Sequence, residues 1–435
     1  MMEPKRVLLL SYQFPPVGGA GVQRAVKFVK YLPDHGWRAT VLTVANPSVP
    51  VLDDSLMADL PSGTDVRRAR TLEPGYAMKA AVSAGDGGAG GLRQQLKGLA
   101  RRLVNLALQP DPQVLWMPGA LAEGRRILRE TPHQAIMATG PPFSSFLTAA
   151  KLSRISGLPL LLDYRDEWGI SNTYLENKRI GRVSLSIQSR MQRGVIRQAR
   201  AIVATTGPSA AELDRLRIAA GGTARVACIY NGFDPDDFTE ATPTTAPDRY
   251  RLAYVGTLWN LCDVGPLVDA ILNLSRRRPD LASGLELAFA GRRTAGQDAQ
   301  LARLDGLPCR LELHAYIDHK RAVALARSAD SLLVLLSDVP EAGRVVPAKV
   351  FESMAARVPI LVIAPKGEVW DLLEGHPAAG RFEPSDVSGI ADYLGSAVDR
   401  KRNGEAASFQ GYDPSCYDRR RLTAQLAGLL DEIAI

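Results

Sequence analysis

The sequence predicts an α/β chain of two doubly wound domains, each built around a parallel sheet. Short apolar segments of strand length alternate with segments of helix length along the chain. The length of 435 residues exceeds what one hydrophobic core usually supports. A stretch rich in Thr and Pro, residues 239–249, separates two series of these units, so we predict a linker there.

The first series predicts an N-terminal domain over residues 1–238. Its strands are expected at 6–10, 38–44, 135–139, 159–164, 201–206 and 228–230. Its helices are expected at 22–35, 143–156 and about 183–199. Short apolar strands alternating with helices in this way are typical of a parallel sheet.

The second series predicts a C-terminal domain over residues 250–410. Its strands are expected at 250–256, 285–291, 310–316, 331–337 and 359–365. Ligands of such sheets bind at the carboxyl ends of the strands, so a cleft between the domains would face both sets of strand ends.

The overall composition is that of an ordinary globular protein. The chain is 46% apolar and 23% charged, and its net charge of +7 favours anionic partners. We expect no nucleic acid among them, because no known nucleic-acid-binding module is recognisable. No stretch resembles a secretory signal or a membrane span, which predicts a cytoplasmic protein.

Metal binding is not expected. The four cysteines are far apart, and neither a Cys-x-x-Cys pair nor a mixed Cys/His cluster is present. We expect them to be reduced thiols: Cys228, Cys262, Cys309 and Cys416.

Residues 92–107 follow a glycine-rich stretch and form a basic amphipathic pattern. Leucines recur there at helical spacing beside Arg and Lys, and no acidic residue lies between Gly87 and Gln109. Such a helix can lie on an anionic membrane, or it can pack on the protein's own core. Peripheral contact with the inner face of a membrane is therefore one of two predictions for this segment.

A glycine-rich loop, residues 14–22, follows the first strand and opens a helix. Gly18, Gly19 and Gly21 would let the backbone approach a phosphate or a sugar at the helix N-terminus, so we predict that they bind such a ligand. The alternative is a tight turn with no ligand. A dinucleotide fold is not expected, because Arg24 occupies the third glycine position of Gly-x-Gly-x-x-Gly.

A second candidate site spans residues 340–352, between a buried strand and a helix. Pro347 suits the first turn of that helix, whose amides and the preceding Val345 and Val346 would cradle a diphosphate. Arg344 and Lys349 would add cations that stabilise the departing diphosphate. Glu352 could accept two hydrogen bonds from a ribose diol. The alternative is an amphipathic helix with a surface Glu–Lys pair.

Several segments together resemble one enzyme family, the retaining family-four glycosyltransferases of GT-B fold. This fold has two Rossmann-like domains, an interdomain cleft and a last helix that crosses back to the first domain. The resemblance covers nearly the whole chain in the right order. It rests on the glycine loop, Asn231-Gly232-Phe233-Asp234, Pro-x-Lys-x-Phe-Glu at 347–352, Asp163 to Trp168 and the C-terminal segment 411–435.

The resemblance implies roles for single residues. Glu352 matches the last glutamate of the family's Glu-x7-Glu motif, which holds the ribose, whereas Arg344 stands where the first glutamate is expected. The turn Gly256-Thr257 follows the second domain's first strand. No Arg or Lys follows it within 258–267, so Arg292 or Lys349 would supply the missing charge. The remaining match is the base-reading loop, Tyr316-Ile317.

Asp166 is the predicted catalytic or acceptor-binding residue, although it could equally cap the helix that follows.

The reaction that the resemblance implies moves a sugar from a nucleotide-diphosphate sugar to an acceptor, with retention and without a metal or other cofactor. The acceptor, a small molecule or a lipid-linked saccharide, stays open. Two alternatives also stay open: a sugar-nucleotide 2-epimerase and a non-catalytic binding protein.

Overall fold

The computed structural model describes residues 4–76, 78, 106–171, 181–238 and 249–434. The chain divides into two compact units, Met1–Tyr230 with Leu422–Ile435, and Asn231–Arg421. Most of the basic segment 92–107 and of the linker 239–249 lies outside the described residues, so both stay predictions.

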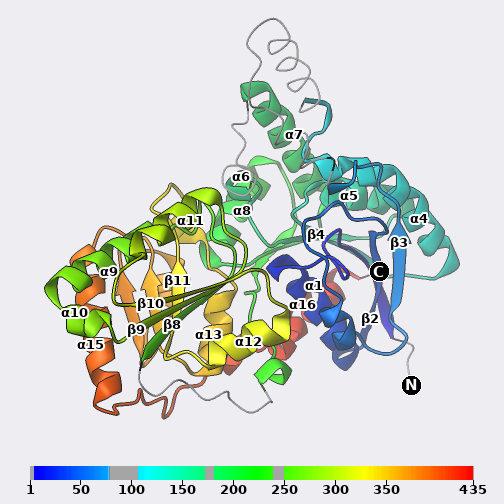
Figure 1. Cartoon of the computed structure of the whole chain (residues 1–435). Coiled ribbons are helices and arrows are strands. Elements are labelled where there is room, and N and C mark those ends of the chain that lie inside the picture. Colours follow the sequence, from blue (N-terminus) through cyan, green and yellow to red (C-terminus); the bar gives the residue numbers. More distant parts are fainter. Residues whose placement is uncertain (1–3, 77, 79–105, 172–180, 239–248, 435) are drawn as a thin grey trace, which may run out of the picture. The chain divides into compact units, whose positions relative to one another are not determined.

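The first unit contains a parallel sheet in the order β3-β2-β1-β4-β5-β6-β7 (Figure 1). Its inner strands are buried on both faces, which explains their continuous apolar runs. The strands are β1 (Lys5–Leu10), β2 (Trp37–Val44), β3 (Asp65–Ala69), β4 (Ala135–Gly140), β5 (Leu160–Tyr164), β6 (Ala201–Ala204) and β7 (Arg225–Cys228).

Helices cover this sheet and enclose one hydrophobic core. They are α1 (Ala20–Tyr31), α4 (Met117–Glu130), α5 (Ser144–Ser156), α6 (Trp168–Ile170), α7 (Arg182–Gln198), α8 (Gly207–Ala219) and α16 (Arg419–Ile433). The predicted helix 22–35 is α1 followed by a short 3-10 turn, Leu32–His35, which ends at Gly36 in the left-handed conformation.

The second unit contains a parallel sheet in the order β10-β9-β8-β11-β12-β13. Its strands are β8 (Tyr250–Val255), β9 (Leu285–Ala290), β10 (Arg310–His314), β11 (Ser331–Leu335), β12 (Ile360–Ile363) and β13 (Ala379–Phe382). Its helices are α9 (Gly265–Arg277), α10 (Pro279–Ala282), α11 (Ala295–Leu301), α12 (His319–Arg327), α13 (Lys349–Ala356), α14 (Glu368–Leu372) and α15 (Val387–Arg402). Two parallel sheets with flanking helices confirm the predicted fold class.

Helix α16 returns to the first unit, as the resemblance implies. Leu422, Leu426 and Leu430 are buried within the first unit's core. Asp431 accepts hydrogen bonds from the side chains of Lys5 and Trp37, at 2.7 and 3.0 Å. The apolar face of α16 and these polar contacts fix the helix beside β1 and β2.

Neither a metal cluster nor a membrane span is found in the part of the chain that the structure describes. No group of three or more His, Cys, Asp or Glu side chains there is arranged to hold a metal ion. No helix in those ranges is both long and apolar enough to cross a bilayer.

Replacing Leu426 with Ala tests the packing of α16. Leu426 is 0% exposed, so Leu426→Ala should lower the free energy of unfolding by about 2–5 kcal/mol. Gln425 is exposed on the opposite face of the same helix, and Gln425→Ala should change it by less than about 0.5 kcal/mol. Urea unfolding followed by circular dichroism measures both. Equal effects of the two substitutions would contradict the packing described here.

Candidate active site

The carboxyl edge of the second unit's sheet begins with two turns that touch backbone to backbone. Gly291, after β9, has a φ of 137°, and a Cβ added to it would lie 1.9 Å from the carbonyl oxygen of Gly256, after β8. The amide of Gly256 donates to Ala290 O at 2.8 Å, and the amide of Leu258 donates to Arg292 O at 2.9 Å. Only glycine fits at position 291, and the two turns form one rigid surface.

Two consecutive arginines follow β9 and differ in their contacts. Arg293 donates to the carboxylate of Asp298 at 2.7 Å and to the carbonyl of His314 at 2.8 Å, so it holds the turn together. Arg292 is exposed, and within the described residues its guanidinium forms no hydrogen bond or ion pair. Arg292 is therefore the cation of this edge that is available to an anionic ligand.

The predicted base-reading loop follows the neighbouring strand, β10. Tyr316 is 37% exposed there, and Ile317 is half-buried. The loop ends where Asp318 accepts a hydrogen bond from the amide of Arg321 and begins α12. Because β8, β9 and β10 are adjacent and parallel, this loop lies at the same edge as the exposed Thr257 and Arg292.

Helix α13 brings Glu352 and Lys349 together. The Lys349 ammonium donates to Glu352 at 2.9 Å, and the Glu352 side chain is only 12% exposed. Burial alone would raise the pKa of Glu352. The positive charges of Lys349, His319 and Arg419 outweigh burial and hold that pKa below its usual value. Glu352 is thus an ionised, nearly buried acceptor, although the Glu–Lys pair of the alternative prediction is also present.

His319 was not identified from the sequence. It begins α12, and its Nε2 lies 3.0 Å from the carboxylate of Asp237. A proton on this imidazole would lower the pKa of Glu352, so His319 belongs to the same cluster. A single histidine carries no motif, and its only signal was its position just after the loop Tyr316-Ile317.

The loop before α13 is fixed by glycine and charge. A Cβ on Gly367 would lie 2.2 Å from the carbonyl oxygen of Gly343, so this loop packs directly on the turn after β12. Arg344 pairs with Glu341 at 3.0 Å. Val346 is buried, and Val345 is half-buried.

The glycine loop of the first unit is shaped largely by its own packing. Gly19 has a φ of 103°, which favours glycine. A Cβ on Gly21 would lie 2.2 Å from Gln13 Oε1 and 2.8 Å from the guanidinium of Arg165. The amide of Gly18 already donates to Val51 O at 3.0 Å. The backbone of Gly19 and the contacts of Gly21 thus favour glycine without a ligand, whereas the hydrogen bond of Gly18 does not require one, and the ligand role of this loop stays a prediction.

Arg165 ties three strand ends of the first unit together. It is 8% exposed, and it donates to Gln13 Oε1 and to the carbonyls of Gly21 and Pro141, which follow β1 and β4. Burial lowers the pKa of Arg165, while the charge of Asp166 opposes that shift. The guanidinium is a fixed structural cation at this edge.

Asp166 is a half-buried carboxylate beside Arg165. Burial raises its pKa, and the charge of Arg165 works in the opposite direction. Among the described residues it forms no hydrogen bond. The N-cap of α6 is Glu167, which makes no side-chain capping bond. The alternative prediction that Asp166 caps this helix is therefore wrong.

Arg24 forms a buried ion pair, which explains the departure from the dinucleotide motif. Its guanidinium contacts Asp163 on β5 at 2.8 Å and donates to Tyr230 O at 2.8 Å. A glycine at this position would leave Asp163 buried without a charge partner. The first unit uses this helix position for a structural charge pair.

The predicted site residues thus form two groups. Asp166 and the glycine loop, with Gly18, Gly19 and Gly21, follow strands at the carboxyl edge of the first sheet. The second group follows β8, β9, β10 and β11, at the carboxyl edge of the second sheet, and comprises Gly256, Thr257, Arg292, Tyr316, Ile317, Arg344, Val345, Val346, Lys349 and Glu352.

Comparisons with known proteins support the fold. Residues 18–232 match the family described as Glycosyl transferase 4-like domain. No curated protein sequence matches the chain. Among solved structures, HepE from Anabaena in complex with UDP and glucose is 16% identical, with a TM-score of 0.63, over 98% of this chain and 100% of HepE.

Two further structures share the fold. The lipopolysaccharide outer core galactosyltransferase WaaB is 12% identical, with a TM-score of 0.56, over 98% of this chain and 99% of WaaB. TarM from S. aureus, solved with UDP, is 8% identical, with a TM-score of 0.61, over 98% of this chain and 100% of TarM. Residues 18–232 thus match a glycosyl transferase 4-like domain, and the whole chain has the fold of these GT-B glycosyltransferases.

Proposed function

We propose that the second unit binds a uridine-diphosphate sugar and that the chain transfers its sugar to an acceptor with retention of configuration. The observation that supports this most is the ionised Glu352 at the carboxyl edge of the second sheet. A carboxylate only accepts hydrogen bonds, so it suits the two hydroxyls of a ribose. HepE and TarM were both solved with UDP, which favours this nucleotide.

The diphosphate would be held by cations of the chain. Arg292 is exposed and unengaged within the described residues, whereas Lys349 is paired with Glu352 and Arg344 with Glu341. A sugar leaving a diphosphate adds negative charge to the phosphates, so a cation placed there stabilises the transition state. We propose that Arg292 makes the first contact, and that Lys349 and Arg344 turn from their carboxylates toward the bound diphosphate.

We propose that Asp166 faces the acceptor. It follows β5 at the carboxyl edge of the first sheet, is half-buried, and has a raised pKa. An ionised Asp166 can orient an acceptor hydroxyl, while the departing phosphate takes the hydroxyl proton.

We propose that neither a metal nor another cofactor takes part and that the reaction occurs in the cytoplasm. The acceptor is a small molecule or a lipid-linked saccharide.

A sugar-nucleotide 2-epimerase is the main alternative on this fold, and the match of residues 18–232 to a transferase family favours transfer. Incubation with UDP-sugars distinguishes the two. A transferase releases UDP only when an acceptor is supplied, whereas an epimerase converts the donor alone. Conversion of the donor without any acceptor would contradict our proposal.

Glu352→Gln tests the ribose contact. Loss of the charged hydrogen bonds should weaken UDP binding by about 1–3 kcal/mol, measured by isothermal titration calorimetry. Glu374→Gln is a matched control, because Glu374 is exposed in the same unit and forms no ion pair among the described residues. Unchanged UDP affinity in Glu352→Gln would remove the ribose role.

Arg292→Ala tests the phosphate contact more cleanly than a change at Lys349, which would leave Glu352 without its partner. We expect kcat/KM for the donor to fall on the order of 100-fold, with Tm unchanged, because the Arg292 side chain forms no hydrogen bond or ion pair in the described residues. Arg276→Ala, an exposed arginine on α9, should behave as wild type. Wild-type turnover in Arg292→Ala would contradict the assignment.

Asp166→Asn separates a catalytic role from a structural one. Because the folded protein raises the pKa of Asp166, ionisation costs stability as pH rises through that pKa. The variant should therefore keep or gain stability at pH 7, yet lose kcat by about 10-fold or more. Wild-type activity should rise with pH through the raised pKa. Full activity in the variant would exclude Asp166 from the reaction.

A further inference from the structure

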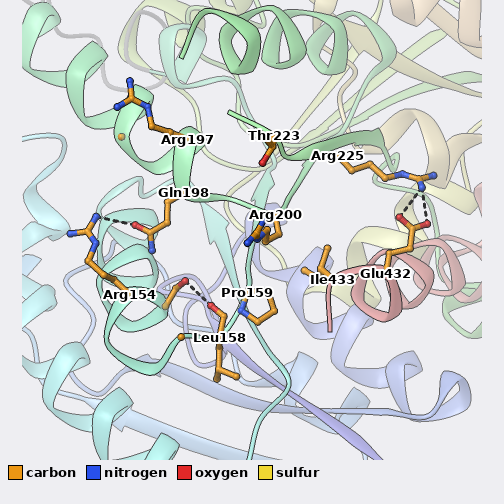
Figure 2. A pocket seen from close by; sticks show the side chains of 13 residues that line it. Arg154, Leu158, Pro159, Arg197, Gln198, Arg200, Thr223, Arg225, Glu432 and Ile433 are labelled. Atoms are coloured by element: carbon orange, nitrogen blue, oxygen red, sulfur yellow. Dashed lines mark hydrogen bonds and ion pairs between the residues drawn. The ribbon is translucent and has the colours of Figure 1, made fainter. Parts of the chain in front are cut away.

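A hollow of about 910 Å³ lies in the first unit (Figure 2). Three of its lining residues precede or begin strands: Pro159 precedes β5, Arg200 precedes β6, and Arg225 begins β7. The hollow therefore lies at the amino edge of the sheet. Asp166 and the glycine loop lie at the opposite, carboxyl edge of the same sheet.

Positive charge dominates this hollow. Four arginines line it, Arg154, Arg197, Arg200 and Arg225, against one acidic residue, Glu432. Four positive charges and one negative charge give the lining a net charge of about +3. Charges of one sign in a concave surface concentrate the field and attract ions of the opposite sign.

Two of these arginines have a structural role in the fold. Arg154 and Arg197 lie in the last turns of α5 and α7, where a cation stabilises the helix dipole. Arg154 also donates to Gln198 at 3.0 Å, and Arg197 donates to the carbonyl of Ala220 at 2.8 Å. Their side chains are thereby held at the rim of the hollow.

Arg200 has no such structural role in the described residues. It lies outside both helices and is exposed, and within the described ranges its side chain forms no hydrogen bond or ion pair. Its carbonyl accepts the amide of Arg225 at 3.0 Å, so the two arginines begin neighbouring strands. Figure 2 shows Arg200 between the Arg154–Gln198 pair and the Arg225–Glu432 pair.

Arg225 can leave its ion pair with Glu432 and bind another anion with little loss of stability. It contacts both carboxylate oxygens of Glu432 at 2.7 Å, but the two side chains are 62% and 46% exposed. Ion pairs this exposed contribute little to stability, so Glu432 can yield Arg225 to a stronger anion. Leu158, Pro159 and Ile433 add an apolar wall against which an organic group can pack.

We propose that this arginine hollow binds a phosphate-bearing ligand. Planar guanidinium groups form paired hydrogen bonds with phosphate oxygens, and two adjacent arginines suit a phosphate better than a single carboxylate. The ligand is held at the amino edge of the sheet and does not react there. It is either a soluble phosphate ester or the head group of an anionic phospholipid.

Calorimetry with inorganic pyrophosphate tests the site, and every protein compared, the one called wild type included, also carries Arg292→Ala to weaken the proposed diphosphate site of the second unit. The double variant Arg200→Ala/Arg225→Ala should bind pyrophosphate at least about 10-fold more weakly than wild type. The control Arg125→Ala/Arg129→Ala removes two exposed arginines from α4 in the same unit and should bind as wild type. Equal affinity of wild type and the Arg200/Arg225 variant, or no binding to wild type, would overturn the proposal.

Two further variants guard against a folding defect. Glu432→Gln removes the competing acid and should tighten pyrophosphate binding several-fold, a gain that damage to the fold would not produce. Arg200→Lys/Arg225→Lys keeps the charge but not the planar fork and should recover part of the lost affinity. Weaker binding in Glu432→Gln would contradict the proposed role of Arg225.

Sedimentation with vesicles distinguishes the two sources of phosphate. Binding to phosphatidylglycerol vesicles but not to phosphatidylcholine vesicles, lost in Arg200→Ala/Arg225→Ala, assigns the hollow to a lipid head group. Vesicle binding that is absent, or unaffected by these arginines, together with arginine-dependent pyrophosphate binding, assigns it to a soluble phosphate ester.

Discussion

The candidate site depends on one constraint: the carboxyl ends of parallel strands lie at the same edge of their sheet. In the second unit the turns after β8 and β9 approach so closely that a single Cβ at Gly291 would overlap the carbonyl of Gly256. Hydrogen bonds between the two turns keep them in register. This contact fixes the backbone from which Arg292 projects, and parallel pairing places the loops after β10 and β11 at the same edge.

Charge at this edge is arranged before any ligand binds. Glu352 is nearly buried, and an ionised carboxylate there would be costly without the nearby cations, which lower its pKa despite burial. The same cations suit a diphosphate. In our proposal, binding a nucleotide sugar exchanges carboxylate partners for phosphate and ribose partners, and little new order is required of the backbone. Arg292 differs from Lys349 and Arg344, because its side chain is paired with no carboxylate in the described residues.

The sequence predicted the fold well because its inner strands are buried on both faces and read as apolar runs. The edge strands were less visible: β3 is polar (Asp-Val-Arg-Arg-Ala) and was not predicted, and β7 lies at Arg225–Cys228 rather than at 228–230. Edge strands face solvent, so the apolar signal fades there. The ion pair between Arg24 and Asp163 was also missed, because the two residues are far apart in the chain.

The candidate site was predictable where a local motif carried it. Glu352, Lys349 and the turn at Gly256 follow from sequence position alone, and all lie at one sheet edge. His319 and the hollow around Arg200 could not be found in this way, since the residues involved meet only through tertiary packing. The glycine loop carries a motif too, but Gly21 is already explained by its packing against Gln13 and Arg165, so the motif alone does not identify a ligand site there.

A crystal structure of the protein with UDP tests the central claim most directly. The account predicts ribose hydroxyls within about 3 Å of the Glu352 carboxylate and the diphosphate beside Arg292, with Lys349 turned toward the phosphates. A nucleotide bound elsewhere, with the Lys349–Glu352 pair intact and Arg292 still in solvent, would contradict it.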